Sequence, residues 1–139
     1  MTSVHASLVS ALVCALVACN DTHALGAEEI GFAPPPSATG WHNKVTGIQA
    51  TMRQARFEIA AADLPVLAAR LPCRLGPPTT DAAEADEMSV GTNDRSWWRP
   101  EEARRHRGCT HSIGIHTMRV LVDLDRPARP TVYLLVMDD

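Results

Sequence analysis

The chain is poor in aromatic residues and has no excess of positive charge. Trp, Tyr and Phe make up only 4% of its 139 residues, so a core would consist mainly of Leu, Val, Ile and Ala. Thirteen Lys and Arg stand against 16 Asp and Glu, a net charge of −3. This near-balance excludes a wholly basic nucleic-acid binder and a wholly acidic disordered tail. The length suits one domain of ordinary size.

Recognisable catalytic motifs are also missing. The sequence contains no nucleophile elbow, no phosphate-binding loop and no metalloprotease helix. Ser112, His116 and Asp123 are the residue types of a catalytic triad, but any chain with six His offers such a set. We therefore expect a protein that is not an enzyme, carries no cofactor and binds no nucleic acid.

The longest apolar run is too short to cross a bilayer. From Ala6 to Ala18 only Ser7 and Ser10 are polar. As a helix this run spans roughly 20 Å, against about 30 Å for the hydrocarbon core. A short N-terminal run of this kind is typical of a signal peptide, here residues 1–18. A buried core helix is the alternative, although polar Asn20 and Asp21 follow at once.

The run ends in Leu16-Val17-Ala18-Cys19, which resembles the lipobox of bacterial lipoproteins. The resemblance implies cleavage before Cys19, a diacylglyceryl group on its thiol, and attachment to the membrane of the cell envelope. Because Asn20 rather than Asp follows the Cys, it implies the outer membrane in a two-membrane bacterium. A structural or partner-binding role in the envelope is then expected. Cleavage after Thr22-His23-Ala24 is the alternative, giving a secreted soluble protein such as an inhibitor or immunity-type protein.

The remaining chain divides into a tether and one globular domain. Residues 19–36 hold three acidic residues and no Lys or Arg, and end in Pro34-Pro35-Pro36, a stiff spacer. We expect this segment to be a lipidated tether. Residues 37–139 should form a single domain.

Two strands and a helix are expected at the start of this domain. Gly40 to Val45 predicts a short strand anchored by Trp41, and apolar residues alternate with polar ones over residues 52–60, as in a half-buried strand. Asp63 and Pro65 then favour a helix start, and Pro72 ends the helix.

The second half predicts a polar connection, a short helix and a hairpin. The connection covers residues 76–93, and the helix runs from Pro100 to Arg107, with acidic residues in its first turn and basic ones in its last. Two β-rich runs, residues 118–124 and 131–137, flank a turn with two prolines and predict a C-terminal hairpin. The expected fold is α+β: a small antiparallel sheet of two N-terminal strands plus the hairpin, with one or two short helices packed on it.

The cysteines of the domain suggest a disulfide. Cys73 and Cys109 form an even pair in an exported chain, and their bond would close a loop of about 37 residues. We predict a Cα–Cα separation of about 4.4–6.8 Å. Two independent buried thiols are the alternative.

Two clusters could form binding sites. His106, His111 and His116, with Cys109, lie within eleven residues and could bind zinc or copper, which makes a periplasmic metal-binding protein the alternative function. Their spacing matches no standard site, so structural or solvated histidines are the simpler interpretation. Trp97 and Trp98 could stack a ligand, but we expect one of them to cover the core and the other to face outward.

Overall fold

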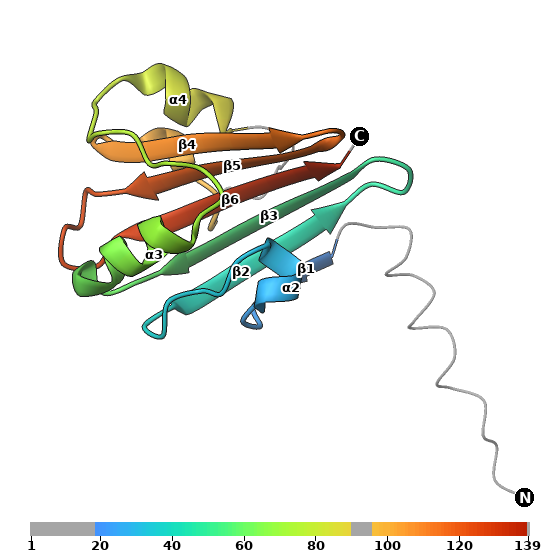
Figure 1. Cartoon of the computed structure of the whole chain (residues 1–139), viewed down its shortest axis with the longest axis horizontal. Coiled ribbons are helices and arrows are strands. Elements are labelled where there is room, and N and C mark those ends of the chain that lie inside the picture. Colours follow the sequence, from blue (N-terminus) through green and yellow to red (C-terminus); the bar gives the residue numbers. More distant parts are fainter. Residues whose placement is uncertain (1–18, 90–95, 139) are drawn as a thin grey trace, which may run out of the picture.

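A six-stranded antiparallel sheet is the framework of the protein (Figure 1). The computed structural model describes residues 19–89 and 96–138, so the predicted signal peptide lies outside the described residues. The strands are β1 (Cys19–Asp21), β2 (Thr39–Thr46), β3 (Thr51–Glu58), β4 (His106–Ile113), β5 (His116–Asp123) and β6 (Thr131–Asp138). Their order in the sheet is β1-β2-β3-β6-β5-β4. The antiparallel α+β fold is thus confirmed.

The two predicted N-terminal strands and the C-terminal hairpin are present as β2, β3, β5 and β6. The alternation in β3 places Ala55 and Phe57 in the core, followed by Ile59, and Trp41 of β2 stacks on Phe57 with ring centroids 4.4 Å apart. The nearly continuous apolar run in β6 also has a clear cause. This strand lies between β3 and β5, and its residues 131–135 are all buried because both faces of the sheet are covered there.

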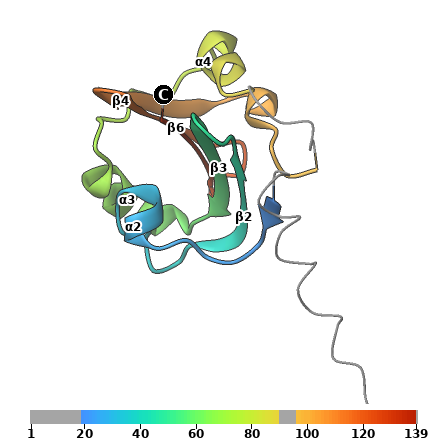
Figure 2. The same cartoon turned by 90° about the vertical axis from the view of Figure 1, so that its right-hand side faces the viewer.

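Helices α2 (Ala27–Ile30) and α3 (Leu64–Arg70) cover one face of the sheet, which curls around them (Figure 2). Leu67 of α3 is fully buried, and Pro65 occupies the first turn as predicted. Asp63 does not cap α3 through its side chain. Its carboxylate instead accepts hydrogen bonds from the backbone N–H and the hydroxyl of Ser37, 3.2 and 2.5 Å away. It therefore ties the chain before β2 to the start of the helix.

The expectation of a free tether over residues 19–36 is wrong for the described part of that segment. Cys19 to Asp21 pair with β2, and Leu25, Ile30 and Phe32 are buried in the same core as Phe57. Burying these three apolar side chains stabilises the folded chain, whereas an extended spacer would leave them exposed to water. Residues 19–36 thus belong to the globular domain.

The predicted helix from Pro100 to Arg107 is also wrong. Its first turn exists as the 3₁₀ helix η2 (Pro100–Glu102), but the chain then straightens and enters β4 at His106. The carboxylate of Asp125 accepts hydrogen bonds from the backbone N–H groups of Arg104 and Arg105 at 2.9–3.0 Å. These N–H groups therefore do not continue a helix. The ladder of eight residue pairs with β5 outweighs the local helix signals.

The second face of the sheet is covered by η2, both adjacent Trp residues and α4 (Ala82–Glu87). Helix α4 lies inside the stretch predicted as a polar connection. Asp81 begins it by accepting a hydrogen bond from the N–H of Ala83 at 3.0 Å. Ala85 and the following Met88 are buried against the sheet, and this explains why a segment with four acidic residues forms structure.

Candidate binding cleft

A polar cleft of about 480 Å³ opens on the second face, beside the Trp97-Trp98 segment. Strands β2, β3, β5 and β6 provide its floor, and the segment from Ser96 to Glu102 forms its wall. The lining residues are His42, Arg56, Ser96, Trp97, Arg99, Glu102, Asp123, Asp125 and Tyr133. A concave site with convergent polar and aromatic groups is where ligand binding is most often found.

The sheet register brings the floor residues together. His42 is opposite Arg56 on β2 and β3, and Arg56 is opposite Tyr133 on β6. Because cross-strand partners point to the same face, these three side chains form one row across the cleft. A row on paired strands is held more rigidly than a set of loop residues.

Both tryptophans are buried, which corrects the expectation that one faces outward. The ring of Trp97 stacks on His42, with centroids 5.6 Å apart and planes 14° from parallel. Trp98 meets Tyr133 edge to face at 5.3 Å, and its indole N–H donates to the carbonyl of Met88 at 2.9 Å. Trp97 therefore forms a fixed part of the cleft wall, and the buried Trp98 anchors the chain behind it.

The carboxylates of Asp123 and Asp125 hold the backbone that forms one side of the cleft. Asp125 holds the backbone before β4, and Asp123 accepts a hydrogen bond from the N–H of Asp125 at 2.8 Å. The pKa of Asp123 is raised, chiefly because burial disfavours its charged form, and the nearby charge of Asp125 adds to this effect. Burial likewise raises the pKa of Tyr133, while the charge of Arg56 opposes the shift. The cleft therefore presents a neutral phenol on its floor at ordinary pH.

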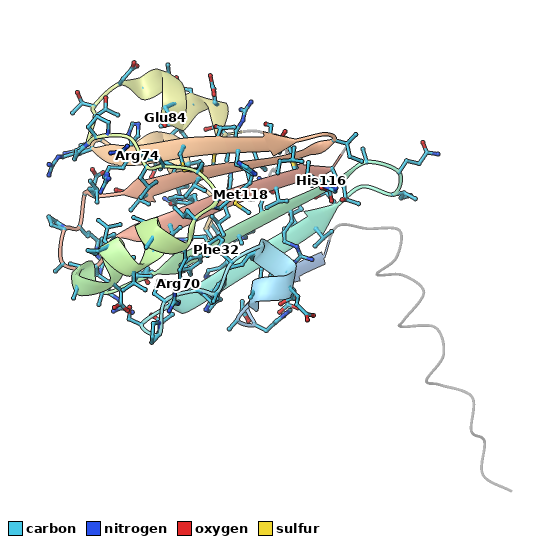
Figure 3. All side chains as sticks on the ribbon, viewed as in Figure 1. Phe32, Arg70, Arg74, Glu84, His116 and Met118 are labelled. Carbon is cyan, nitrogen blue, oxygen red and sulfur yellow. A yellow bond between two sulfur atoms is a disulfide. The ribbon has the colours of Figure 1, made fainter. Side chains whose placement is uncertain are left out.

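The three histidines of the predicted metal site are not brought together. His106 is buried on the second face, where its Nε2 lies 3.5 Å from Oε2 of Glu84 on α4. His111 is five residues further along β4, an odd separation that places it on the opposite face. His116 bonds to Asp138 at the far end of the sheet, and Figure 3 labels His116 there and Glu84 on the other side of the molecule. Within the described residues no three potential ligands form a metal site, so the structure does not bring the predicted ligand set together.

The predicted disulfide is present. Cys73 and Cys109 are bonded, with their Cα atoms 5.8 Å apart. Cys73 follows α3 as expected, but Cys109 lies in the middle of β4 rather than after a helix. The bond therefore joins the helical cover to the outer strand of the sheet, and it removes Cys109 from any set of metal ligands.

Trp97 of the cleft wall could be proposed as a ligand contact from the sequence, but the residues of the cleft floor could not. His42, Arg56 and Tyr133 are far apart in the chain, and only the pairing of β2, β3 and β6 unites them. The sequence holds one weak indication of the floor, because Arg56 is one of the polar residues in the alternating strand of residues 52–60. The contact of Glu84 with His106 was missed for the same reason, because it joins a helix and a strand that sequence patterns do not connect.

No helix within the described residues is long and apolar enough to span a membrane. Comparison of the chain with protein-family models, with curated proteins and with solved structures gave no match.

Proposed function

We propose that this protein is an exported, lipid-anchored protein of the bacterial cell envelope that binds a partner through the cleft. The disulfide between Cys73 and Cys109 is the observation that carries the export part of this proposal. Disulfides persist in oxidising compartments and are rare in the cytosol. The resemblance of Leu16-Val17-Ala18-Cys19 to a lipobox supplies the anchor, at Cys19.

Preorganisation of the cleft supports the binding part. The carboxylates of Asp123 and Asp125 already have hydrogen-bond partners within the protein, and Trp97 is fixed by its contact with His42. A partner would therefore meet a surface that needs little further ordering, which favours affinity. The exposed side chains of Arg99 and Glu102 at the rim can contribute specificity through charge.

Metabolic labelling with an alkyne-bearing fatty acid tests the anchor. We expect the label on the chain and the chain in the membrane fraction, with both lost in Cys19→Ser. Titration of thiols in the purified, unfolded, unreduced protein tests export and should find Cys73 and Cys109 oxidised. Unchanged labelling and partition in Cys19→Ser would refute the anchor.

In-cell crosslinking followed by solubilisation tests the cleft. Arg99→Glu should reduce the recovery of a crosslinked envelope partner. Arg74→Glu is the matched control, because Arg74 is equally a surface arginine and makes the same change of charge away from the cleft. Equal loss in both variants, or loss in neither, would refute the cleft as the binding surface.

A further inference from the structure

Two apolar hairpin tips lie at the same end of the sheet, the end where β1 begins. The turn between β2 and β3 carries Ile48, which is 80% exposed. The turn between β4 and β5 carries Ile113 and Ile115, which are 65% and 58% exposed. These three isoleucines, with Val45 at 38%, are the exposed large apolar residues of the described part of the chain.

The sheet register places both tips at one end. Thr51 at the start of β3 is opposite Asp138 of β6, and Asp138 is opposite His116 at the start of β5. One strand thus separates β3 from β5, so these two strands lie about 10 Å apart and the midpoints of the two turns about 14 Å apart across the sheet. Figure 1 shows both turns beside the C-terminus, at the opposite end from the turn between β5 and β6.

The same end holds the residue that the proposed function lipidates. Cys19, the first residue of β1, is directly opposite Val45. Val45 precedes Ile48 by only three residues, so an acyl group on Cys19 would start near the β2–β3 tip, at the same end of the sheet as the β4–β5 tip. We propose that the surface formed by Val45, Ile48, Ile113 and Ile115, here called the tip surface, lies in the membrane interface together with the lipid of Cys19. This inference rests on the proposed function.

The chemistry of the tips fits a lipid surface. Residues 46–51 and 112–115 contain no Asp, Glu, Lys or Arg, whereas the turn at the opposite end carries Asp125, Arg126 and Arg129. Several exposed large apolar residues at one end of a protein commonly mark a site of membrane or protein contact. A bilayer is the occupant favoured here, because the lipid at Cys19 would bring this end, and no other, to its surface.

A second feature extends the tip surface inward. A hollow of about 300 Å³, lined mostly by apolar atoms, lies under the β4–β5 tip. Ile113, Met118, Val136 and Pro72 contribute to its wall. Figure 3 labels Met118 and His116 along this side of the sheet. Acyl chains that reach this end would therefore meet apolar side chains on both sides of Ile113.

The test uses tryptophan fluorescence in vesicles with brominated acyl chains, which quench an indole that enters the bilayer. Full-length Ile48→Trp and Ala128→Trp are matured in cells, purified and reconstituted into phosphatidylcholine–phosphatidylglycerol vesicles. Ala128 is exposed in the turn at the opposite end and is the matched control. The parent chain gives the baseline, because Trp41, Trp97 and Trp98 are all buried.

We expect bromination to reduce the added fluorescence of Ile48→Trp at least twofold and to leave that of Ala128→Trp unchanged. Ile113→Trp should be quenched to the same extent as Ile48→Trp. Agreement between the two variants shows that the quenching does not come from a local effect of one substitution. Mass spectrometry of the N-terminal peptide reports separately whether Cys19 carries lipid. A lipidated, vesicle-bound chain without quenching at Ile48→Trp and Ile113→Trp overturns this inference and leaves the proposed function standing. A chain that carries no lipid and does not float with vesicles overturns both.

Discussion

Replacing Cys73 and Cys109 together with alanine should destabilise the protein through its unfolded state. The bond links residues 36 positions apart and so restricts a large loop of the unfolded chain. The loop-closure relation gives about 3.8 kcal/mol for a loop of this size. Both cysteines also pack against the core of the first face, but alanine keeps their Cβ atoms, so the packing loss is small by comparison. For a domain of this length the loss corresponds to a fall in Tm of roughly 15 °C.

Urea denaturation followed by tryptophan fluorescence measures this loss, since Trp41, Trp97 and Trp98 are buried in the folded state. The parent protein in excess reductant is the control and should unfold at the same urea concentration as the double variant. A loss below about 1 kcal/mol would contradict the reasoning, because the unfolded chain would then not be restricted by the bond.

Three further predictions concern individual contacts. Gly108→Ala should destabilise the protein by about 1–3 kcal/mol, because the added Cβ would lie 2.2 Å from Oε1 of Glu84. Adding Glu84→Ala should recover part of this loss in a double-mutant cycle measured by urea denaturation. Strictly additive losses in the two variants would contradict the contact. Trp98→Phe should cost about 1–3 kcal/mol in the same assay, since the carbonyl of Met88 loses its buried donor, and an unchanged midpoint would show that this bond is unimportant. His116→Ala should raise the pKa of Asp138, which the hydrogen bond from His116 holds below its ordinary value. The stability linked to Asp138 is present above its unfolded-state pKa and is lost as pH falls through its lower folded-state pKa. Carboxyl NMR titration of the parent and the variant measures the change, and equal values would refute the pairing.

The sequence predicted the elements whose signals are local. Strand β3 shows its alternation within nine residues, and β6 shows its central place through an unbroken apolar run. The register between β3 and β6 is then restricted, because the apolar side chains of both strands must lie in the core together. The disulfide could be predicted because the expected signal peptide and the even number of cysteines in the domain both favour an oxidising compartment.

The wrong predictions arise where distant contacts override local chemistry. Pro100, Glu101 and Glu102 are good residues for a helix start, and they do form one turn. The helix stops because Asp125, more than twenty residues away, takes the next backbone N–H groups. Strand β4 itself has little β propensity, since it contains Gly108 and two histidines, and only its pairing with β5 makes it a strand.

The prediction of a tether over residues 19–36 is wrong for a different reason. Their acidic side chains and the three prolines are typical of a spacer, and Leu25, Ile30 and Phe32 are spaced too irregularly to indicate a helix or a strand. Their burial depends on the curvature of the sheet, which leaves space on the first face that α3 alone does not fill (Figure 2). Irregular apolar residues next to a domain are therefore weak evidence for a tether.

The positions of the cleft and the tip surface make the two proposals consistent with each other. His42 of the cleft lies four residues before Thr46, which ends β2 at the tips, so about 13 Å of strand separates them. Two further cleft residues, Asp123 and Asp125, lie still further away, at and beyond the end of β5. With the tip surface in the membrane interface, the mouth of the cleft would stay outside the lipid, accessible to a protein of the envelope. A lipid anchor on a long flexible tether would not fix this orientation, whereas a lipid on Cys19 would, because β1 is paired with β2 from this residue onward.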